Sequence, residues 1–140
     1  FTEHESRGQE IYVNSNCAFC HHQESGAMDD AAKNGLDAVS ADPGTAREGA
    51  HFRPAPLRNI AASGPYMHDG RFSSLREVID FYDHGVQDNP DLSLLLFDVN
   101  ANAPRRLNLS EEDKQALQAF LNTFTDTSLL TDPKFSDPFQ

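Results

Sequence analysis

The chain has 140 residues, of which 38% are hydrophobic, and its formal net charge is −11. This length predicts one small domain. The acidic balance argues against nucleic acid as a partner, because phosphates are bound by Lys and Arg, and it favours basic partners. The longest apolar run, 94–97, is far shorter than the roughly 20 residues of a membrane-spanning helix, so we expect no membrane span.

The first predicted helix covers about 5–14 and ends just before a pair of cysteines. Cys17, Cys20 and His21 form a Cys-x-x-Cys-His pattern, which is typical of the covalent attachment of a c-type haem. Two thiols one helical turn apart can add to the two vinyl groups of a porphyrin, and the histidine can then bind the iron from one side. The sequence therefore predicts one covalent haem c with His21 as an iron ligand.

Three other chemistries could use the same cysteines. A thioredoxin-like redox disulfide normally lies in a βαβ setting, and nothing before Cys17 alternates like a strand. A zinc site needs four N or S ligands, and the remaining histidines are not arranged in close pairs. A plain structural disulfide between Cys17 and Cys20 is the third alternative. We prefer haem c because it accounts for both thiols and the adjacent histidine together.

The middle of the chain lacks regular periodicity. The passage 23–51 is rich in Gly, Asp and Ala, and we expect a loop with short helical turns. The following segment, 52–65, contains Pro54, Pro56 and Pro65, which do not fit a regular helix or a central strand. We expect 52–65 to wrap the haem as extended chain.

A second helix is marked at both ends. Ser74 and Glu77 form a capping box, and Gly85 can close the C-terminus. Its apolar residues fall at i, i+3, i+4 and i+7, and are Leu75, Val78, Ile79 and Tyr82. One face of this helix is therefore predicted to be buried, with a tyrosine at its end.

A third helix begins at Ser110, and three acidic residues in its first turn complement the helix dipole. Its buried stripe is predicted to be Leu117, Phe120, Leu121 and Phe124. We expect this helix to pack across the first one. Residues 1–125 would then form the core of a single domain, 1–140, with 126–140 as a C-terminal arm. No strand pattern or internal repeat is visible, so the predicted fold class is all-α.

The runs 52–60 (FRPAPLRNI) and 64–72 (GPYMHDGRF) resemble the bacterial di-haem cytochrome c peroxidase and MauG family. The similarity is to the C-terminal domain of those proteins, which carries the electron-transfer haem, and it continues to 131–139. The resemblance implies a cytochrome c-like fold, with helices packed around one covalently attached haem and long irregular loops.

Three side chains are candidates for the second axial ligand of the iron. In the family this ligand comes from the helix after the His-Asp-Gly motif, as methionine in peroxidases and tyrosine in MauG-like proteins, and that position is Tyr82 here. A phenolate lowers the reduction potential, whereas Met67, the second candidate, would raise it. His84 is the third candidate, two residues beyond Tyr82.

The resemblance also implies supporting roles. Arg58 matches an arginine that faces a haem propionate, a geometry suited to a planar guanidinium. His68 could act as an acid or base together with Asp69, although a turn at this position is an equally good explanation. The carbonyl groups of Ser63 and Pro65 match positions that help to hold calcium between the family's two haem domains, which makes calcium a second possible cofactor.

The family's N-terminal half, with its second Cys-x-x-Cys-His and the peroxidatic haem, has no counterpart in this chain, and neither does the relay tryptophan between the haems. We therefore expect a mono-haem electron-transfer domain that serves a redox partner, either a basic protein or a second haem domain. The alternative is a haem peroxidase or MauG-like oxidoreductase that acts with a second haem domain or subunit. Because bacteria attach haem c outside the inner membrane, we expect a periplasmic location.

Overall fold

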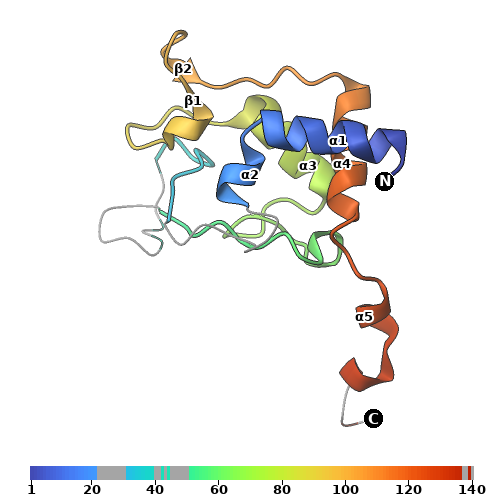
Figure 1. The fold of residues 1–140 in the computed structure, drawn as a ribbon. Helices are drawn as coiled ribbons and strands as arrows, with labels where there is room; N and C mark the ends of the chain where they lie inside the picture. The colour runs from blue at the N-terminus through green and yellow to red at the C-terminus, as the bar shows by residue number, and fades with distance from the viewer. Residues whose placement is uncertain (22–30, 40–41, 43, 45–50, 137–138, 140) are drawn as a thin grey trace.

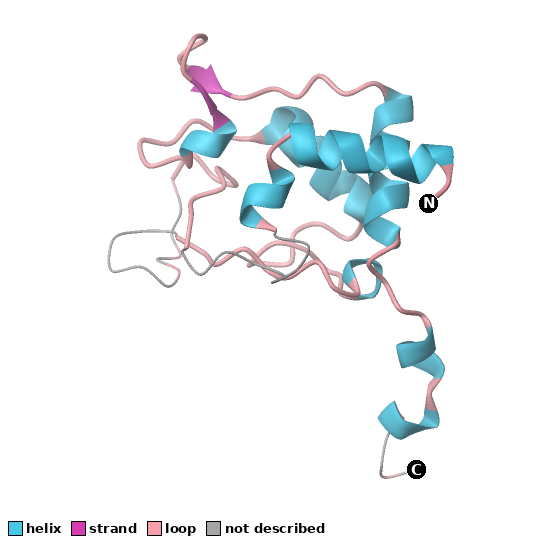
Figure 2. Ribbon diagram, viewed as in Figure 1, coloured by secondary structure: helices cyan, strands magenta, loops and turns pink. Residues whose placement is uncertain are grey.

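The computed structural model describes residues 1–21, 31–39, 42, 44, 51–136 and 139. Its α-helices, in chain order, are α1 (Glu3–Asn14), α2 (Cys17–Cys20), α3 (Leu75–Asp80), α4 (Glu111–Asn122) and α5 (Ser128–Thr131). A π-helical turn, Phe81–Gly85, continues α3, and 3-10 turns lie at Ile60–Ala62, Leu94–Leu96 and Pro133–Phe135. Long irregular segments connect these helices, as Figures 1 and 2 show.

The two longest helices, α1 and α4, pack across each other as predicted (Figure 1). A capping box between Thr2 and Glu5 starts α1 two residues earlier than the sequence pattern indicates. The helices approach closely at Gly8, where an added Cβ would lie 2.1 Å from the carbonyl oxygen of Ala116. Glycine at this position therefore allows the crossing.

The core around this crossing forms the first hydrophobic cluster. Tyr12 and Phe120 lie at its centre, with relative exposures of 1% and 0% and ring centroids 5.3 Å apart. The other buried members are Ile11, Leu75, Ile79, Ala116, Leu117 and Leu121. Phe124 lies beyond the end of α4 but still packs against the cluster. The α2 helix borders it through Cys17 and Ala18.

The helix after Ser74 differs from its prediction. Its capping box with Glu77 is present, but the α-helix ends at Asp80 and a π-helical turn follows. Leu75 and Ile79 pack in the first cluster, whereas Tyr82 packs in another part of the structure. The expected single stripe is wrong because a π-helical turn holds more residues than an α turn and so moves later side chains off the original face.

A second hydrophobic cluster receives the residues of the π-helical turn. Its buried members are Leu36, Phe81, Val86 and Leu92, with Met67, Phe72, Tyr82, Leu96 and Phe97 packed against them. Gly85 ends the turn without a left-handed φ, and an added Cβ there would lie 3.1 Å from a Phe81 ring carbon. The two candidate ligands Met67 and Tyr82 thus belong to one cluster.

A short β-ribbon is an exception to the predicted absence of strands. Strands β1 (Phe97–Asp98) and β2 (Ala103–Pro104) pair antiparallel, with Phe97 opposite Pro104. The connecting turn is fixed by the Asp98 carboxylate, which accepts hydrogen bonds from the amides of Asn100 and Ala101. Strands of two residues are too short to show an alternating pattern, which is why the sequence does not predict them.

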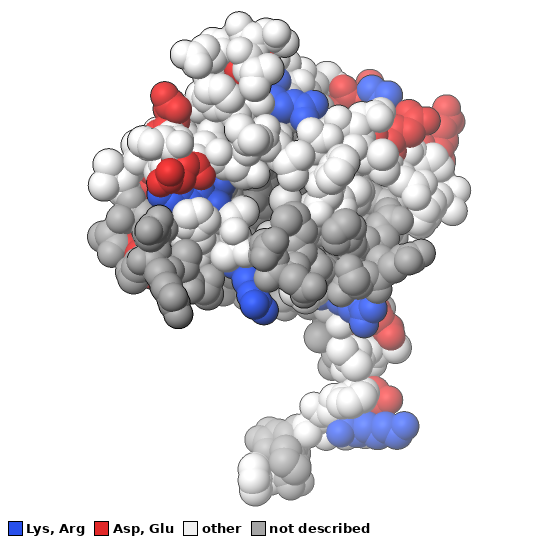
Figure 3. Space-filling model, turned by 60° about the vertical axis from the view of Figure 1, so that its left-hand side comes forward, with Lys and Arg blue, Asp and Glu red and all other residues white. Residues whose placement is uncertain are grey.

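The chain after α4 runs away from the body of the molecule (Figure 1). Asn59 fixes its beginning, because the Asn59 side chain accepts a hydrogen bond from the Asp126 amide at 2.8 Å. The predicted loop 23–51 lies partly outside the described residues. Among the described residues, no helix is long and apolar enough to cross a membrane. On the face shown in Figure 3, acidic side chains lie at the upper right and at the left of the body, and Lys and Arg are scattered.

Candidate functional site

The cysteine pair lies on a single helical turn. Asn16, in a left-handed conformation with φ of 66°, separates α1 from α2, and α2 begins at Cys17. The His21 amide donates to the Cys17 carbonyl at 2.9 Å, which closes the turn. Both thiols are free. The predicted motif is therefore displayed as one compact unit at the edge of the first cluster.

The imidazole of His21 is oriented by a backbone group from a distant segment. Its Nδ1 lies 2.8 Å from the carbonyl oxygen of Ala55, which can only accept a hydrogen bond, so Nδ1 carries the proton. Burial lowers the pKa of His21 and favours the neutral ring. The Tyr12 hydroxyl donates to the His21 carbonyl and fixes the backbone of the same residue. A neutral imidazole with Nδ1 engaged leaves Nε2 as an electron-pair donor for a metal.

The environment of the thiols does not suit disulfide exchange. Burial raises the pKa of Cys17 to about 11, and burial also raises the pKa of Cys20. Redox-active cysteines need a lowered pKa, because the thiolate is the reactive form. The thioredoxin-like alternative is therefore not supported by this structure.

Tyr82, Met67 and Asn34 meet in the second cluster. The Asn34 amide donates to the Met67 sulfur at 3.7 Å, and it also makes a side-chain hydrogen bond with Tyr82. Burial raises the pKa of Tyr82 to about 12, although the bond to Asn34 opposes this rise. The thiols of Cys17 and Cys20 also raise this pKa.

Met67 lies in a strained backbone conformation. Its φ is 71°, in the left-handed region that residues other than glycine rarely adopt. It opens a tight turn in which the Gly70 amide donates to the Met67 carbonyl, between the paired residues Tyr66 and Phe72. Such strain is common where a side chain must be presented to a site.

The other predicted site residues lie farther out. His84 is exposed, and its Nδ1 lies 3.2 Å from the carboxylate of Asp83. Arg58 is exposed in the segment that precedes the Ile60–Ala62 turn. Arg71 Nε donates to the Asp69 carboxylate at 2.8 Å, so Asp69 does not pair with His68 alone.

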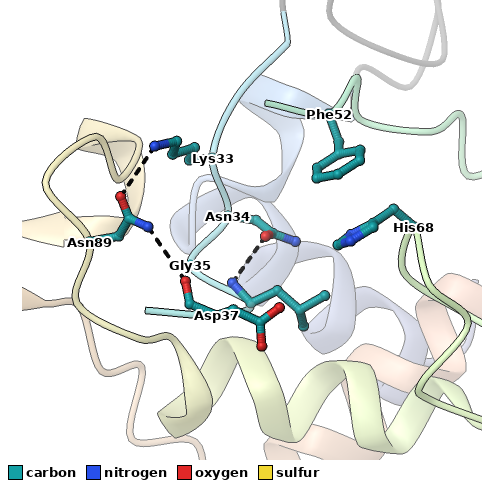
Figure 4. Close-up of a pocket in the computed structure, with 8 residues that line it drawn as sticks. Lys33, Asn34, Gly35, Asp37, Phe52, His68 and Asn89 are labelled. Atoms are coloured by element: carbon teal, nitrogen blue, oxygen red, sulfur yellow. Dashed lines mark hydrogen bonds between the residues drawn. The ribbon is translucent and has the colours of Figure 1, made fainter. Parts of the chain in front are cut away.

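His68 borders a small pocket next to Asn34, shown in Figure 4. Its ring stacks on Phe52, with centroids 3.8 Å apart and an interplanar angle of 13°. The remaining lining residues are Lys33, Gly35, Leu36, Asp37 and Asn89. Asn34 has no motif around it and lies in a passage without periodicity, so the sequence gives no signal that it contacts both candidate ligands.

No group of three or more His, Cys, Asp or Glu side chains in the described part of the chain is placed to hold a metal ion. Within these residues a zinc site therefore has no support. Ser63 and Pro65 are exposed, and calcium at their carbonyl groups stays a prediction.

The residues present fit a covalently bound haem. Two free thiols stand one turn apart, the adjacent imidazole has its Nδ1 engaged, and two further ligand types lie in the neighbouring cluster. A profile of the Cytochrome c family matches residues 5–125. The chain belongs to the cytochrome c family, whose members bind haem c covalently.

Within this family, the chain is related to cytochrome-c peroxidases and to MauG. It is 36% identical over 91 residues to cytochrome-c peroxidase IdrP1 of Pseudomonas sp. (strain SCT), which is 64% of this chain and 22% of that protein. Methylamine utilization protein MauG of Paracoccus denitrificans is 29% identical over 170 residues, 90% of this chain and 43% of that protein.

A solved structure supports the same relationship. The crystal structure of a MauG-like protein associated with microbial copper homeostasis matches with a TM-score of 0.73 and 31% identity. The match covers 100% of this chain and 52% of that one. The chain therefore spans about half or less of these relatives.

Proposed function

We propose that this chain is the electron-transfer haem domain of a di-haem peroxidase or MauG-like system, and that it passes single electrons through one covalent haem c. The observation that carries this proposal is the pairing of a Cys-x-x-Cys-His turn with a His21 ring whose Nδ1 is bound by Ala55. The relatives named above add support, because each is a longer protein in which this chain matches one portion.

A bound haem would supply one-electron redox chemistry at its iron. Cys17 and Cys20 would hold it through two thioether bonds. Each bond forms when a thiol S–H adds across a vinyl double bond, so no external oxidant is consumed. His21 would bind the iron through Nε2, with Ala55 fixing the orientation of the ring.

We infer that Tyr82 is the second axial ligand and that Met67 is its neighbour rather than its substitute. Both side chains interact with Asn34, and Tyr82 stands at the position from which MauG-like proteins supply a tyrosine ligand. Arg58 would pair with a propionate from the exposed segment before the Ile60–Ala62 turn. A phenolate ligand favours ferric iron, so the expected reduction potential is low.

Electron paramagnetic resonance and redox titration of the ferric protein test the ligand assignment. The wild type should give a low-spin signal and resist reduction by ascorbate. Tyr82→Phe should lose that signal, whereas Met67→Leu should keep it. Loss of the signal in Met67→Leu alone, together with easy reduction of the wild type, would instead assign methionine.

A second candidate function is oxidoreductase chemistry in partnership with a second haem domain or subunit. It is favoured by the names of the relatives, which include cytochrome-c peroxidases and MauG. The isolated chain should show negligible turnover of hydrogen peroxide with a reduced donor. Robust turnover by the isolated chain would contradict the carrier assignment.

The expected partner is a basic redox protein or a second haem domain, in keeping with the net charge of −11. Attachment of haem c implies export, so we propose a periplasmic location. Haem incorporation that depends on export of the protein would support this location, and attachment in the cytoplasm would contradict it.

A further inference from the structure

The π-helical turn that carries Tyr82 rests on a buried ion pair. Asp83 and Lys114 have relative exposures of 5% and 8%, and they are the buried polar residues of the described core. Lys114 Nζ, from α4, lies 2.7 Å from Asp83 Oδ2 and 2.8 Å from Asp80 Oδ1. One cation thus joins the last residue of α3 and the middle of the turn to a helix of the first cluster.

The same turn is also held by the segment before α4. The Leu109 amide donates to Asp83 Oδ1 at 2.9 Å, and the Leu107 amide donates to the Asp83 carbonyl at 3.1 Å. Arg106 donates to the carbonyl groups of His84 and Val86 at 2.6 and 3.1 Å. The carbonyl groups that a π-helical turn leaves without helical partners therefore have partners here.

These contacts bear on which cluster the Tyr82 side chain joins. Leu75 and Ile79 of α3 face the first cluster, whereas Tyr82 joins the second cluster, where Asn34 contacts it. A continued α-helix would place Tyr82 on the same face as Leu75, seven residues earlier. The π-helical geometry, which is often found at functional sites, is what separates them.

We propose that the Asp83–Lys114 ion pair positions Tyr82 by fixing the π-helical turn, and that Asp83 and Lys114 are therefore positioning residues for the axial ligand. This inference rests on the proposed function, because it concerns the ligand assigned there. A buried ion pair is weak evidence for stability alone but is well suited to selecting one local geometry.

The test compares haem-loaded variants by electron paramagnetic resonance and by reduction potential. Lys114→Met removes the cation and keeps most of the apolar stem, whereas Lys114→Arg keeps a positive charge at this position. Arg76→Gln is the matched control, because Arg76 also binds Asp80, at 2.9 Å, but binds Glu111 and not Asp83. Tyr82→Phe supplies the spectrum of protein without the phenol.

Lys114→Met should lose half or more of the wild-type low-spin signal and shift toward the Tyr82→Phe spectrum. Lys114→Arg should recover most of the signal, and Arg76→Gln should keep it. A wild-type spectrum and potential in Lys114→Met would overturn the inference, whatever the loss in thermal stability.

Asp83→Asn tests the same pair if Lys114→Met does not fold, since the amide can still accept from Leu109. It should show the same partial loss of signal, and an unchanged signal would count against the positioning role. If Tyr82→Phe itself keeps the wild-type spectrum, the ligand assignment fails, and that result is separate from any effect of Lys114.

Discussion

At the scale of single residues, two hydrogen bonds hold His21 in an orientation suited to binding a metal. Nδ1 contacts the Ala55 carbonyl at 2.8 Å, and the His21 carbonyl accepts a hydrogen bond from the Tyr12 hydroxyl. The first contact fixes the ring and the second fixes the backbone. Together they restrict where Nε2 can lie.

The Tyr12 hydroxyl gives a test of this arrangement. Tyr12→Phe removes the bond to His21 and should lower the free energy of unfolding by about 1 kcal/mol, the usual net value of such a bond. It should also broaden the low-spin signal of the haem-loaded protein, because the His21 backbone is less restricted.

Tyr66→Phe is the matched control, because the Tyr66 hydroxyl donates at 2.8 Å to the Ile60 carbonyl and not to a residue of the cysteine motif. It should cost a similar free energy in urea unfolding and leave the signal unchanged. Equal broadening in both variants would argue against a specific role for Tyr12.

The sequence identifies Cys17, Cys20 and His21 because these residues act as neighbours in the chain. Ala55 and Asn34 could not be found in the same way. Ala55 contributes only a backbone carbonyl, which any residue type carries, and Asn34 lies in a passage without periodicity. Partners that come from irregular segments leave no pattern in a single sequence.

At the scale of elements, the three predicted helices are present, although the second ends early at Asp80, and N-caps explain where the second and third begin. Ser74 and Ser110 are the N-caps of α3 and α4, and both were visible as local signals. The π-helical turn was not predicted, because the Leu75 to Tyr82 spacing fits a continuous α-helix equally well. Tertiary contacts from Lys114 and Arg106 are what distinguish the two geometries.

Gly8 tests the crossing of α1 and α4. Gly8→Ala would normally stabilise a helix interior by up to about 1 kcal/mol. Here the new Cβ would lie 2.1 Å from the Ala116 carbonyl oxygen, so we expect a net loss of about 1–3 kcal/mol in the free energy of unfolding. Val13→Ala, at an exposed position of α1, should change it by less than about 0.5 kcal/mol. A more stable Gly8→Ala protein in urea unfolding would refute the close crossing.

The same pair of helices predicts a dependence on pH. Arg7 donates to Asp113 at 3.0 and 2.9 Å, and these hydrogen bonds lower the pKa of Asp113 below its ordinary value of 3.8. Because the pKa is lower in the folded state, the stabilisation is complete above about pH 4 and is lost as the pH falls through the folded pKa.

Asp113→Asn should therefore be less stable than wild type at pH 7, and the difference should shrink below about pH 4. Urea unfolding of both proteins across this range measures the difference. A stability difference between the two proteins that stays constant down to the lowest pH would show that the charge of Asp113 does not cause it.

At the scale of the whole molecule, the residues of the candidate site are divided between the two hydrophobic clusters. The cysteine turn borders the first cluster, and Met67 and Tyr82 border the second. The chain also spans about half or less of the relatives described above. The proposal of an electron-transfer domain agrees with both observations.

The C-terminal arm gives a prediction at this scale. It leads away from the body (Figure 1), and Leu129 and Phe135 on it are 38% and 65% exposed. Removing 127–140 should change the free energy of unfolding by less than about 0.5 kcal/mol and leave the haem spectrum unchanged. Urea unfolding of the shortened chain checks this, and a loss of cooperative unfolding would show that the arm belongs to the core.

The proposed function requires a haem bound covalently to Cys17 and Cys20. Intact mass spectrometry of the chain, matured in a host that attaches haem c, measures it directly. We expect the mass of the polypeptide plus one haem, with the addition retained after denaturation and absent in a Cys17→Ala, Cys20→Ala double variant. A bare polypeptide mass in a host that attaches haem to a control cytochrome c would contradict it.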